Sequence, residues 1–538
     1  MNDFKTGMAK NAITMHDDFA VYLALQEAKR GGNVHASLSE NSKINDFMCW
    51  DASSLYPSTF FLPMPYEPFK YIYECDNATF EAKVKEKKYA ILFRVAFYGI
   101  RLRNDHEPVP YISKSKCRNV VGLGKLREKR GYSSATPEFT QDVVTGEEDN
   151  GRVRDAVYLE CTLTDIDARI IMEEFGGMYT YDEYVIIDAW QSRYHLLPIE
   201  LRDFIAECYR NKTAYKNKPG DALHTAEYYQ NEYKRCKIVA NGVYGLFAMA
   251  ILRPIDIVYS EKLGDYIPVS TNADKYTVEN KEKYEKAIKK LAICPRLGIW
   301  ICAYGRSRLQ ELIDLVGADD HLYNDTDSVM AKNWEKLVPM IDKLNEKYIK
   351  IAKASGACAQ DVKGEWHYCG AFEFDKVNLK KGERGEFKAL GSKKYAYNII
   401  KKDDEGNEYR CDTHITLAGV PKSEGAKELQ EAGGLAAFKP GMVFSAGKLR
   451  PIYHDGDNGT FHVYDYNGEY GDVSPKSGVC LVDVDYKLSY GETYGDLVKV
   501  NKDGTREVME ENLQRMLRET QNDTAVLEYY KKKYNIDL

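Results

Sequence analysis

The order of apolar and polar residues predicts a mixture of strands and helices. Apolar side chains alternate with others over residues 88–97, which is typical of a half-buried strand, and residues 157–162 predict a second strand. Thr164 and Asp167 form a capping-box pattern, so we expect a helix to begin there and to end near Phe175. Further helices are predicted over residues 15–30, 198–216, 224–240 and 278–292, and a short buried strand followed by a helix over residues 298–316. This mixture indicates an α+β fold in which strands present carboxylates.

Length, charge and cysteine content narrow the possible classes. The chain has 538 residues, enough for three or four domains. Its 82 acidic residues outnumber its 75 basic ones, and the net charge of −7 excludes a uniformly basic nucleic-acid coat but not a local basic groove. We expect no transmembrane helix and no secretory signal, because long apolar runs are missing. The 12 cysteines include no CxxC pair, which indicates reduced thiols in a cytosolic protein and no zinc site.

The strongest local signal is the acidic segment Tyr323-Asn324-Asp325-Thr326-Asp327-Ser328. Apolar residues on both sides predict a hairpin with the two aspartates at its tip. Two crowded carboxylates repel each other unless a cation lies between them, and a divalent metal is the usual partner of such oxygen ligands. An ordinary turn rich in aspartate is the alternative interpretation of this segment alone.

A metal site at this turn needs a further acid, and Asp51 is the candidate. It follows the apolar run Phe47–Trp50, so we expect a buried strand to place it at the strand's end. Pro57 is expected to end the local structure. The alternative for Asp51 alone is an aspartate that caps a helix.

Two further segments carry groups suited to phosphates and bases. Lys237, Asn241 and Tyr244 are spaced i, i+4 and i+7, so they share one helix face on which a cation, an amide and an aromatic ring suit a nucleotide. The alternative is an amphipathic helix that ends at a glycine cap. Residues 376–402 hold nine lysines and arginines against two glutamates, a local charge of 9 − 2 = +7. A basic strand with interleaved tyrosines suits a phosphate backbone, and a solvated edge strand is the alternative.

Taken in this order, the four segments resemble the motifs of the family B DNA polymerases. The matching segments are Asp51–Ser58 for motif A, Lys237–Gly245 for motif B, Tyr323–Ser328 for motif C and Lys393-Lys394-Tyr395 for the Lys-x-Tyr motif. The resemblance is closest to the protein-primed branch of bacteriophages and linear plasmids. Arg30-Gly31-Gly32 resembles the Tyr-x-Gly-Gly signal of that branch, and residues 155–190 resemble its first terminal-protein region. Weaker matches to its thumb lie at Leu417–Val420 and Ser474–Gly478.

The resemblance implies an α+β right-hand polymerase fold with an antiparallel-sheet palm, helical fingers, a small thumb and terminal-protein-region insertions. The expected division is an N-terminal segment with the first part of the palm (1–66), an insertion resembling terminal-protein region 1 (67–197), fingers (198–247), an insertion resembling terminal-protein region 2 (248–296), palm (297–412), thumb (413–490) and a C-terminal helical extension (491–538).

The resemblance also implies roles for individual residues. Asp51, Asp327 and the carbonyl of Ala52 would hold two Mg²⁺ ions, with Mn²⁺ as a substitute, and Asp325 would support them as a third catalytic carboxylate. Tyr56 would stack under the deoxyribose and exclude a 2′-hydroxyl. The other nucleotide contacts would be Lys237, Asn241, Tyr244, Gly245, Ser54, Leu55, Lys212 and Lys216, and the DNA contacts would be Lys393, Tyr395, Arg30, Gly31 and Gly32.

The implied function is a template-directed DNA polymerase that adds dNTPs to a 3′-hydroxyl or to the hydroxyl of a terminal protein. Its partners would be template and primer DNA, dNTPs and a terminal protein, without a membrane, in the cytoplasm of a host bacterium that carries the phage or linear-plasmid genome. Two other hypotheses stay open: a polymerase that uses nucleic-acid primers or none, and an inactive DNA-binding scaffold. Intact crowded acids argue against the scaffold, which has no physical need for them.

The sequence departs from the family pattern at three places. Gly242 stands where the family has serine, and Lys29 stands where the Tyr-x-Gly-Gly signal has tyrosine. Only 50 residues precede Asp51, whereas the family's exonuclease domain needs roughly 100 residues or more. We therefore expect no 3′–5′ exonuclease in this chain, and a separate subunit as its source.

Overall fold

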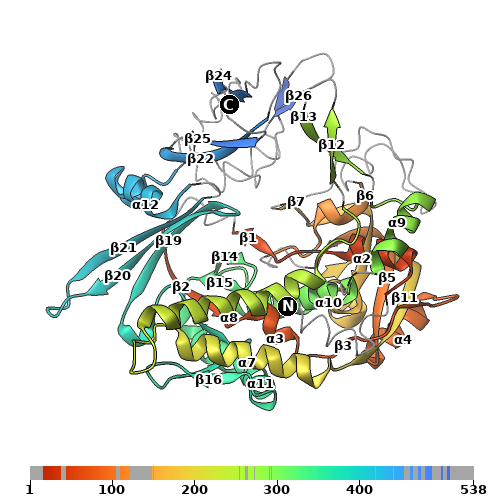
Figure 1. Cartoon of the computed structure of the whole chain (residues 1–538), viewed down its shortest axis with the longest axis horizontal. Helices are drawn as coiled ribbons and strands as arrows, with labels where there is room; N and C mark the ends of the chain where they lie inside the picture. The colour runs from red at the N-terminus through yellow and green to blue at the C-terminus, as the bar shows by residue number, and fades with distance from the viewer. Residues whose placement is uncertain are drawn as a thin grey trace.

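Two antiparallel sheets and several long helices make up this computed structural model (Figure 1). It describes residues 16–439 except for 38–43, 104–108, 122–147, 150, 254, 261–264, 272, 290, 292–293 and 418–419, and beyond them residues 442–453 and short strands up to Val508. Within these ranges, no helix is both long enough and apolar enough to span a bilayer. The predicted mixture of helices and strands is confirmed.

The first sheet has β2 (Asn45–Ala52) near its middle. Four consecutive residues of β2, Phe47–Trp50, are almost fully buried, because other elements cover both faces of the strand. The order of the sheet is β1 (Val34–Ala36), β14 (His321–Asp325), β15 (Ser328–Ala331), β2, β19 (Arg384–Gly391), β20 (Lys394–Lys402) and β21 (Glu408–Leu417), with β18 (Phe372–Phe374) also paired with β2. The predicted buried strand before Asp51 is therefore confirmed.

The second sheet contains both strands that the alternation predicts. The strand predicted over residues 88–97 is part of β5, which begins one residue later at Tyr89, and residues 157–162 lie in β9. The order is β3 (Met64–Pro65), β11 (Glu183–His195), β5 (Tyr89–Leu102), β9 (Asp155–Thr164) and β6 (Cys117–Val121), with β4 (Lys70–Tyr71) on β11 and β10 (Tyr179–Thr180) on β5. Helix α4 (Asn77–Glu86) covers this sheet and places the ring of Phe80 4.5 Å from that of Phe93.

Helix α10 (Pro295–Val316) joins the cores of the two sheets. Its first half, around Trp300, packs in the core that reaches the second sheet, and its second half, around Leu312, packs in the core beneath the first sheet. The prediction of a short strand at the start of residues 298–316 is wrong, because Pro295 begins one continuous helix. The apolar run is buried on all sides, so it lacks the alternation of apolar and polar residues by which a strand and a helix can be distinguished in a sequence.

The remaining predicted helices are present with shifted ends. The capping box of Thr164 and Asp167 is confirmed, but α6 (Asp165–Ile171) ends early and a short 3₁₀ turn, Glu173–Phe175, follows. The long helices α7 (Ile199–Tyr215) and α8 (Ala226–Phe247) lie side by side along one edge of the molecule (Figure 1). The other helices are α2 (Phe19–Ala28), α3 (Leu55–Thr59), α9 (Val278–Ile288), α11 (Val338–Ala354) and α12 (Lys422–Glu431).

Several small hairpins complete the described elements. They pair β7 (Glu148–Asp149) with β8 (Arg152–Val153), β12 (Ile255–Ser260) with β13 (Asp265–Ser270), β16 (Cys358–Gln360) with β17 (Trp366–Tyr368), β22 (Val443–Tyr453) with β25 (Val479–Lys487), β23 (Phe461–Tyr464) with β24 (Tyr470–Val473) and β26 (Val498–Val500) with β27 (Arg506–Val508). The weak thumb match at 474–478 and most of the expected extension at 491–538 lie outside the described residues, as does part of Leu417–Val420.

Candidate active site

Asp51 and the acidic segment meet at one end of the first sheet. Ser328, the first residue of β15, lies directly opposite Asp51 on β2. The backbone N–H of Ala52 donates to the carbonyl oxygen of Asp327 at 2.8 Å. The acidic segment forms the tip of the β14–β15 hairpin, as predicted. Two stretches of chain that are far apart in sequence therefore place their aspartates side by side.

Crowding and burial change the acidity of both aspartates. Burial raises the pKa of Asp51, and the charge of Asp327 raises it further. Burial and the charge of Asp325 likewise raise the pKa of Asp327. Each carboxylate thus lies where another negative charge is unfavourable. A divalent cation relieves this repulsion, and two carboxylates beside the Ala52 backbone are an oxygen donor set that fits Mg²⁺.

The sequence analysis missed a second charged pair beside this site. Asp375 and Lys376 follow β18, which pairs with β2 on the side opposite β15. The backbone N–H of Asp375 donates to the carbonyl of Cys49 at 3.0 Å, and the Lys376 amine contacts the Asp375 carboxylate. Asp375 raises and Lys376 lowers the pKa of both Asp51 and Asp327. The signal in the sequence is the apolar alternation of residues 372–374, which ends in this charged pair.

The segment Arg30–Asn33 supports the acidic turn from the other side. The N–H of Thr326 donates to the carbonyl of Asn33 at 2.8 Å. A Cβ on Gly32 would lie 2.5 Å from the Thr326 hydroxyl oxygen, so only glycine fits this close approach. Gly31 has no such neighbour, and the Arg30 side chain is 6% exposed and bonded to main-chain carbonyls. The structure therefore places these residues against the turn, with Arg30 inside the protein.

Two tyrosines stack beside the aspartates. The ring of Tyr56 on α3 lies 4.4 Å from that of Tyr244 on α8, at an interplanar angle of 20°. The Tyr244 hydroxyl lies 3.0 Å from the Cys302 sulfur. Gly305, one turn further along α10, leaves room for the Tyr56 ring, since a Cβ there would lie 3.0 Å from it. The roles of Cys302 and Gly305 are not apparent in the sequence, where both look like ordinary core residues.

Motif A continues into a short helix. The prediction that Pro57 ends the local structure is wrong, because Pro57 is the third residue of α3. The first N–H groups of a helix have no partner within the helix, so proline is tolerated in this turn. Ser54 precedes α3, and Leu55 is its buried first residue.

Helices α7 and α8 place a group of lysines near Ser54. The Lys212 amine donates to the Ser54 hydroxyl at 2.8 Å. Burial lowers the pKa of Lys212, and the nearby charges of Lys216 and Lys237 lower it further. The charges of Cys369 and Glu373 raise the pKa of Lys212 and so oppose this effect. Lys212, Lys216 and Lys237 therefore repel one another, and such a group of cations is favourably placed to bind a polyanion.

The face of α8 that carries Lys237 is otherwise open. Asn241 is exposed, and Tyr244 is half-buried. The alternative of a glycine cap is wrong, because α8 continues past Gly245 to Phe247. A Cβ on Gly242 or Gly245 would meet nothing within 4 Å, so the two glycines leave bare backbone beside Tyr244.

The basic strand also reaches the acidic turn. The Lys393 N–H donates to the Tyr323 hydroxyl at 3.0 Å, and its amine forms an ion pair with Asp325. Lys393 has a φ of 58° in the turn between β19 and β20. The Tyr395 ring is 7% exposed and lies 4.8 Å from the ring of Tyr323. The structure therefore brings Lys393 to the site and packs Tyr395 into the core beneath it.

A separate cluster of metal-ligating groups lies near β17. Among the described residues, the side chains of Asp361, Glu365 and His367 place ligand atoms within 4.8 Å of one another. His367 lies 3.0 Å from Glu373 and 3.6 Å from Asp361, so ion pairs account for this arrangement. It is not the cluster that the sequence predicts.

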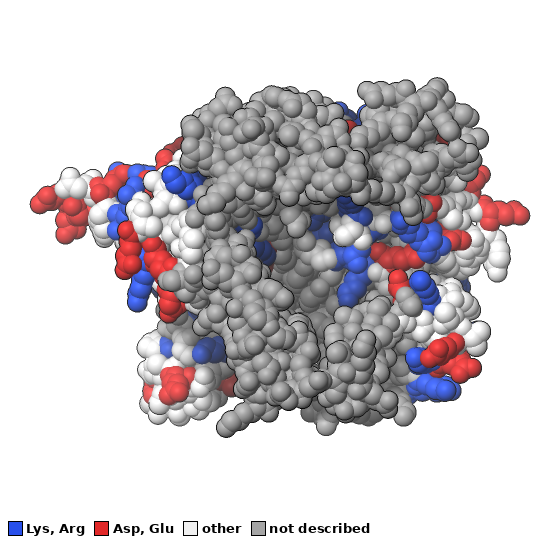
Figure 2. Space-filling view, turned by 90° about the horizontal axis from the view of Figure 1, so that it is seen from above, with Lys and Arg blue, Asp and Glu red and all other residues white. Residues whose placement is uncertain are grey.

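Charges on the face seen in Figure 2 are mixed in sign. Lysines and arginines lie beside acidic side chains at both ends of this face, among the residues that the structure describes. This face is therefore not uniformly basic, as the acidic overall composition predicts.

Comparison with known proteins shows that the fold is similar to that of one DNA polymerase of known structure. No protein-family profile and no curated protein matches the sequence. Phi29 DNA polymerase complexed with primer-template DNA and incoming nucleotide substrates matches with a TM-score of 0.52 at 15% identity, over 88% of this chain and 63% of that chain. Its post-translocation binary complex with primer-template DNA matches with a TM-score of 0.52 at 15% identity, over 90% and 65%. The chain thus shares the fold of phi29 DNA polymerase and spans a little under two thirds of that protein's length.

Proposed function

We propose that this chain is a template-directed DNA polymerase that joins dNTPs by two-metal phosphoryl transfer. The observation that carries the proposal is the meeting of Asp51 with the Asp325–Asp327 turn, beside a lysine group and a tyrosine stack. In this proposal the first sheet is the palm, α7 and α8 are the fingers, and the segment from about residue 413 is the thumb. The fold shared with phi29 DNA polymerase supports it.

The aspartates would hold the metals. Asp51, Asp327 and the Ala52 carbonyl are the proposed ligands, and Asp325 would support them while bound to Lys393. Two Mg²⁺ ions, when bound, supply charge stabilisation for the attacking and leaving oxygens. The protein's own part is to hold these carboxylates together despite their repulsion, so that a divalent cation, on binding, displaces the proton that the raised pKa of Asp51 favours.

The lysines and tyrosines would bind the incoming nucleotide. Lys237, Lys212 and Lys216 would contact the triphosphate, because their mutual repulsion is relieved by a polyanion. Tyr56 would lie against the deoxyribose, and the stacked ring of Tyr244 would hold the Tyr56 ring in position. The base would lie near the open strip of α8, with Asn241 and Gly245 beside it, and Ser54 and Leu55 would add backbone contacts.

The primer and template would lie across the acidic turn. Lys393 is the proposed direct phosphate contact. Tyr395 would support it from the core through Tyr323, whose hydroxyl accepts from the Lys393 N–H. Gly31 and Gly32 would line the path of the DNA, whereas the buried Arg30 would support them. Priming by the hydroxyl of a terminal protein and replication of a phage or linear-plasmid genome stay predictions from the resemblance.

A primer-extension assay tests the proposal. The wild-type chain should incorporate labelled dNTPs on a primed template in the presence of Mg²⁺, and Asp327→Asn should abolish this while the protein stays folded. Asp319→Asn is the matched control, since Asp319 is an exposed acid just before the other end of the same hairpin. Retained activity in Asp327→Asn, or equal loss in Asp319→Asn, would remove the metal assignment. Labelled dATP with a candidate terminal protein, in place of a primer, tests the priming mode through covalent labelling of that protein.

A further inference from the structure

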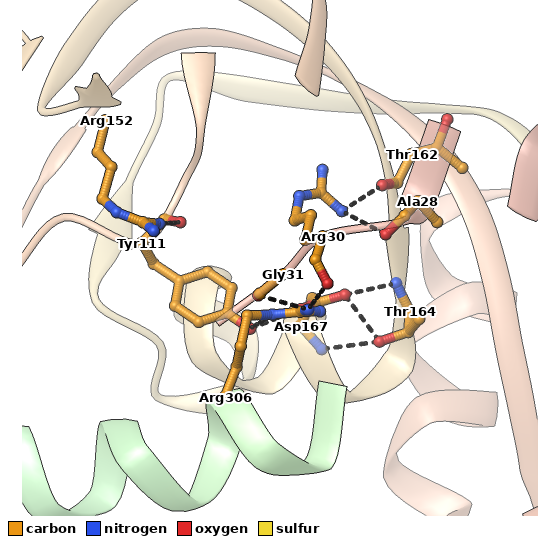
Figure 3. A network of polar contacts seen from close by, with 9 residues as sticks. All are labelled: Ala28, Arg30, Gly31, Tyr111, Arg152, Thr162, Thr164, Asp167 and Arg306. Carbon is orange, nitrogen blue, oxygen red and sulfur yellow. Dashed lines mark hydrogen bonds and ion pairs between the residues drawn. The ribbon is translucent and has the colours of Figure 1, made fainter. Parts of the chain in front are cut away.

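A buried network of charged and polar side chains joins α10 and α6 to the backbone of Arg30 and Gly31 (Figure 3). Arg306 of α10 and Asp167 of α6 form an ion pair at 2.9 Å, with side chains that are 3% and 0% exposed. The Tyr111 hydroxyl donates to the same carboxylate oxygen at 2.6 Å and accepts from Arg306 Nε at 3.0 Å. Thr164 donates its N–H and its hydroxyl to the other oxygen of Asp167. These bonds hold the Arg306 guanidinium in one orientation.

The free end of that guanidinium reaches the segment that supports the turn. Arg306 Nη1 donates to the carbonyl of Arg30 at 2.9 Å and lies 3.5 Å from that of Gly31. The next residues touch the acidic hairpin directly: Gly32 packs on Thr326, and the Asn33 carbonyl accepts bonds from the Thr326 N–H and from Asn324. A short extended stretch of backbone is therefore all that separates Arg306 from the turn.

Arg30 ties the same stretch to the second sheet. Its Nη1 donates to the carbonyls of Ala28 and Thr162, at 3.3 Å and 2.8 Å. Burial alone would raise the pKa of Asp167, but Arg306 and Arg30 outweigh it and hold that pKa below its usual range. The carboxylate therefore stays charged in the interior, and removing it would leave two buried cations without compensation.

We propose that Arg306, oriented by Asp167 and Tyr111, is a positioning residue for the metal-binding turn. It holds the Arg30–Asn33 segment against Thr326 and thereby fixes Asp325 and Asp327 relative to Asp51. None of the three network residues contacts the aspartates of the site in this structure, so they act through the backbone. This inference rests on the proposed function, because it assigns further residues to the same site.

The same helix supplies a matched control. Arg296 of α10 pairs with Asp17 at 3.1 Å, and their side chains are 1% and 2% exposed. Arg296 also donates to main-chain carbonyls, those of Pro65 and Tyr66, which lie on β3 and just after it. The two pairs are alike in burial and chemistry, but they hold different stretches of backbone.

The test compares Arg306→Lys with Arg296→Lys in the full chain. Mn²⁺ binding is measured by titration calorimetry, primer extension is measured as a function of Mg²⁺, and thermal melting reports the folding of each variant. We expect Arg306→Lys to weaken Mn²⁺ binding by about tenfold, the lower end of the loss typical for residues that position metal ligands. The Mg²⁺ needed for half-maximal extension should rise in parallel, while the KM for dNTP at saturating Mg²⁺ stays close to that of the wild type. Arg296→Lys should bind Mn²⁺ as the wild type does.

Two results would overturn the inference: wild-type Mn²⁺ affinity in folded Arg306→Lys, or the same loss in Arg296→Lys. If Arg306→Lys does not fold, Tyr111→Phe takes its place, with a smaller shift expected in the same direction and unchanged Mn²⁺ binding counting against the inference. The proposed function fails separately. A wild-type chain that binds Mn²⁺ but never extends a primer would remove the polymerase and leave the positioning role of Arg306 intact.

Discussion

The rings of Tyr56 and Tyr244 lie nearly parallel, 4.4 Å apart, although one belongs to a short helix after β2 and the other to the far end of α8. Helix α10 holds both, since Cys302 contacts the Tyr244 hydroxyl and Gly305 faces the Tyr56 ring. The stack therefore depends on three separate elements, and its position next to the aspartates makes it a candidate wall of the nucleotide pocket.

Replacing Tyr56 should weaken discrimination against ribonucleotides. Tyr56→Val leaves a small apolar side chain but removes the ring that would meet a 2′-hydroxyl. We expect the ratio of kcat/KM for dNTP over rNTP to fall by roughly tenfold or more, the scale of steric discrimination in a pocket. Single-nucleotide insertion kinetics with both substrates measure it. Tyr228→Ala is the control, because Tyr228 is an exposed tyrosine at the start of α8. An unchanged ratio in Tyr56→Val would place the discrimination elsewhere.

Removing the thiol of Cys302 should loosen Tyr244. Cys302→Ala deletes the contact at 3.0 Å, and one hydrogen bond of about 1 kcal/mol corresponds to roughly a fivefold rise in the KM for dNTP. Cys302→Ser places a hydroxyl close to the position of the thiol and should recover most of the affinity for dNTP. Cys294→Ala is the matched control, a buried cysteine that caps the same helix. Equal effects of Cys302→Ala and Cys294→Ala would show that only core packing is involved.

The local motifs predict the aspartates and the strands that present them, because each signal lies within a few residues. Asp51 follows its own apolar run, and the acidic turn carries its own hairpin pattern. Asp375 and Lys376 were missed because their place depends on β18 pairing with β2, a contact between segments that are distant in sequence. Cys302 and Arg306 were missed for a similar reason. Within α10 they look like core positions, and only the packing of α8, α6 and the Arg30–Asn33 segment against that helix gives them partners.

Neutralising Lys393 should weaken binding of primer-template DNA in a salt-dependent way. If Lys393 contacts one phosphate, the slope of log K for DNA binding against log salt should become shallower by about 1 in Lys393→Gln. Fluorescence anisotropy with labelled primer-template at several salt concentrations measures this slope. Lys401→Gln is the control, because Lys401 lies further along β20 and pairs with Glu383. A slope that stays at the wild-type value in Lys393→Gln would mean that the ion pair with Asp325 is its only role.

The substitution Asp51→Asn should stabilise the metal-free protein at neutral and higher pH. The pKa of Asp51 is raised in the folded chain, mainly by burial and then by Asp327, so the folded state holds the proton more tightly than the unfolded state does. Wild-type stability therefore falls as the pH rises above the ordinary aspartate range of about 4. The asparagine side chain cannot ionise, so the gain should be absent near pH 3 and should reach roughly 1–2 kcal/mol at pH 8, the upper part of the usual gain from a single stabilising substitution.

Urea unfolding in the presence of a chelator, at several pH values, measures this gain. Adding Mg²⁺ should then stabilise the wild type more than the variant, because the cation relieves the same repulsion that the substitution removes. A gain of the same size at pH 3 and pH 8 would contradict the electrostatic origin.

The close approach of Gly32 to Thr326 should be essential for the acidic turn, and it can be tested by compensation. Gly32→Ala puts a methyl group within 2.5–2.8 Å of the Thr326 side chain, so we expect a loss of about 2 kcal/mol in the free energy of unfolding and a loss of Mg²⁺-dependent extension. All the clashing atoms belong to that one side chain, and Thr326 has a φ of 60°, where glycine is unstrained. Adding Thr326→Gly to Gly32→Ala should therefore recover most of both losses. If the double variant is no better than Gly32→Ala alone in denaturant unfolding and Mg²⁺-dependent extension, the segment does not support the turn through this contact.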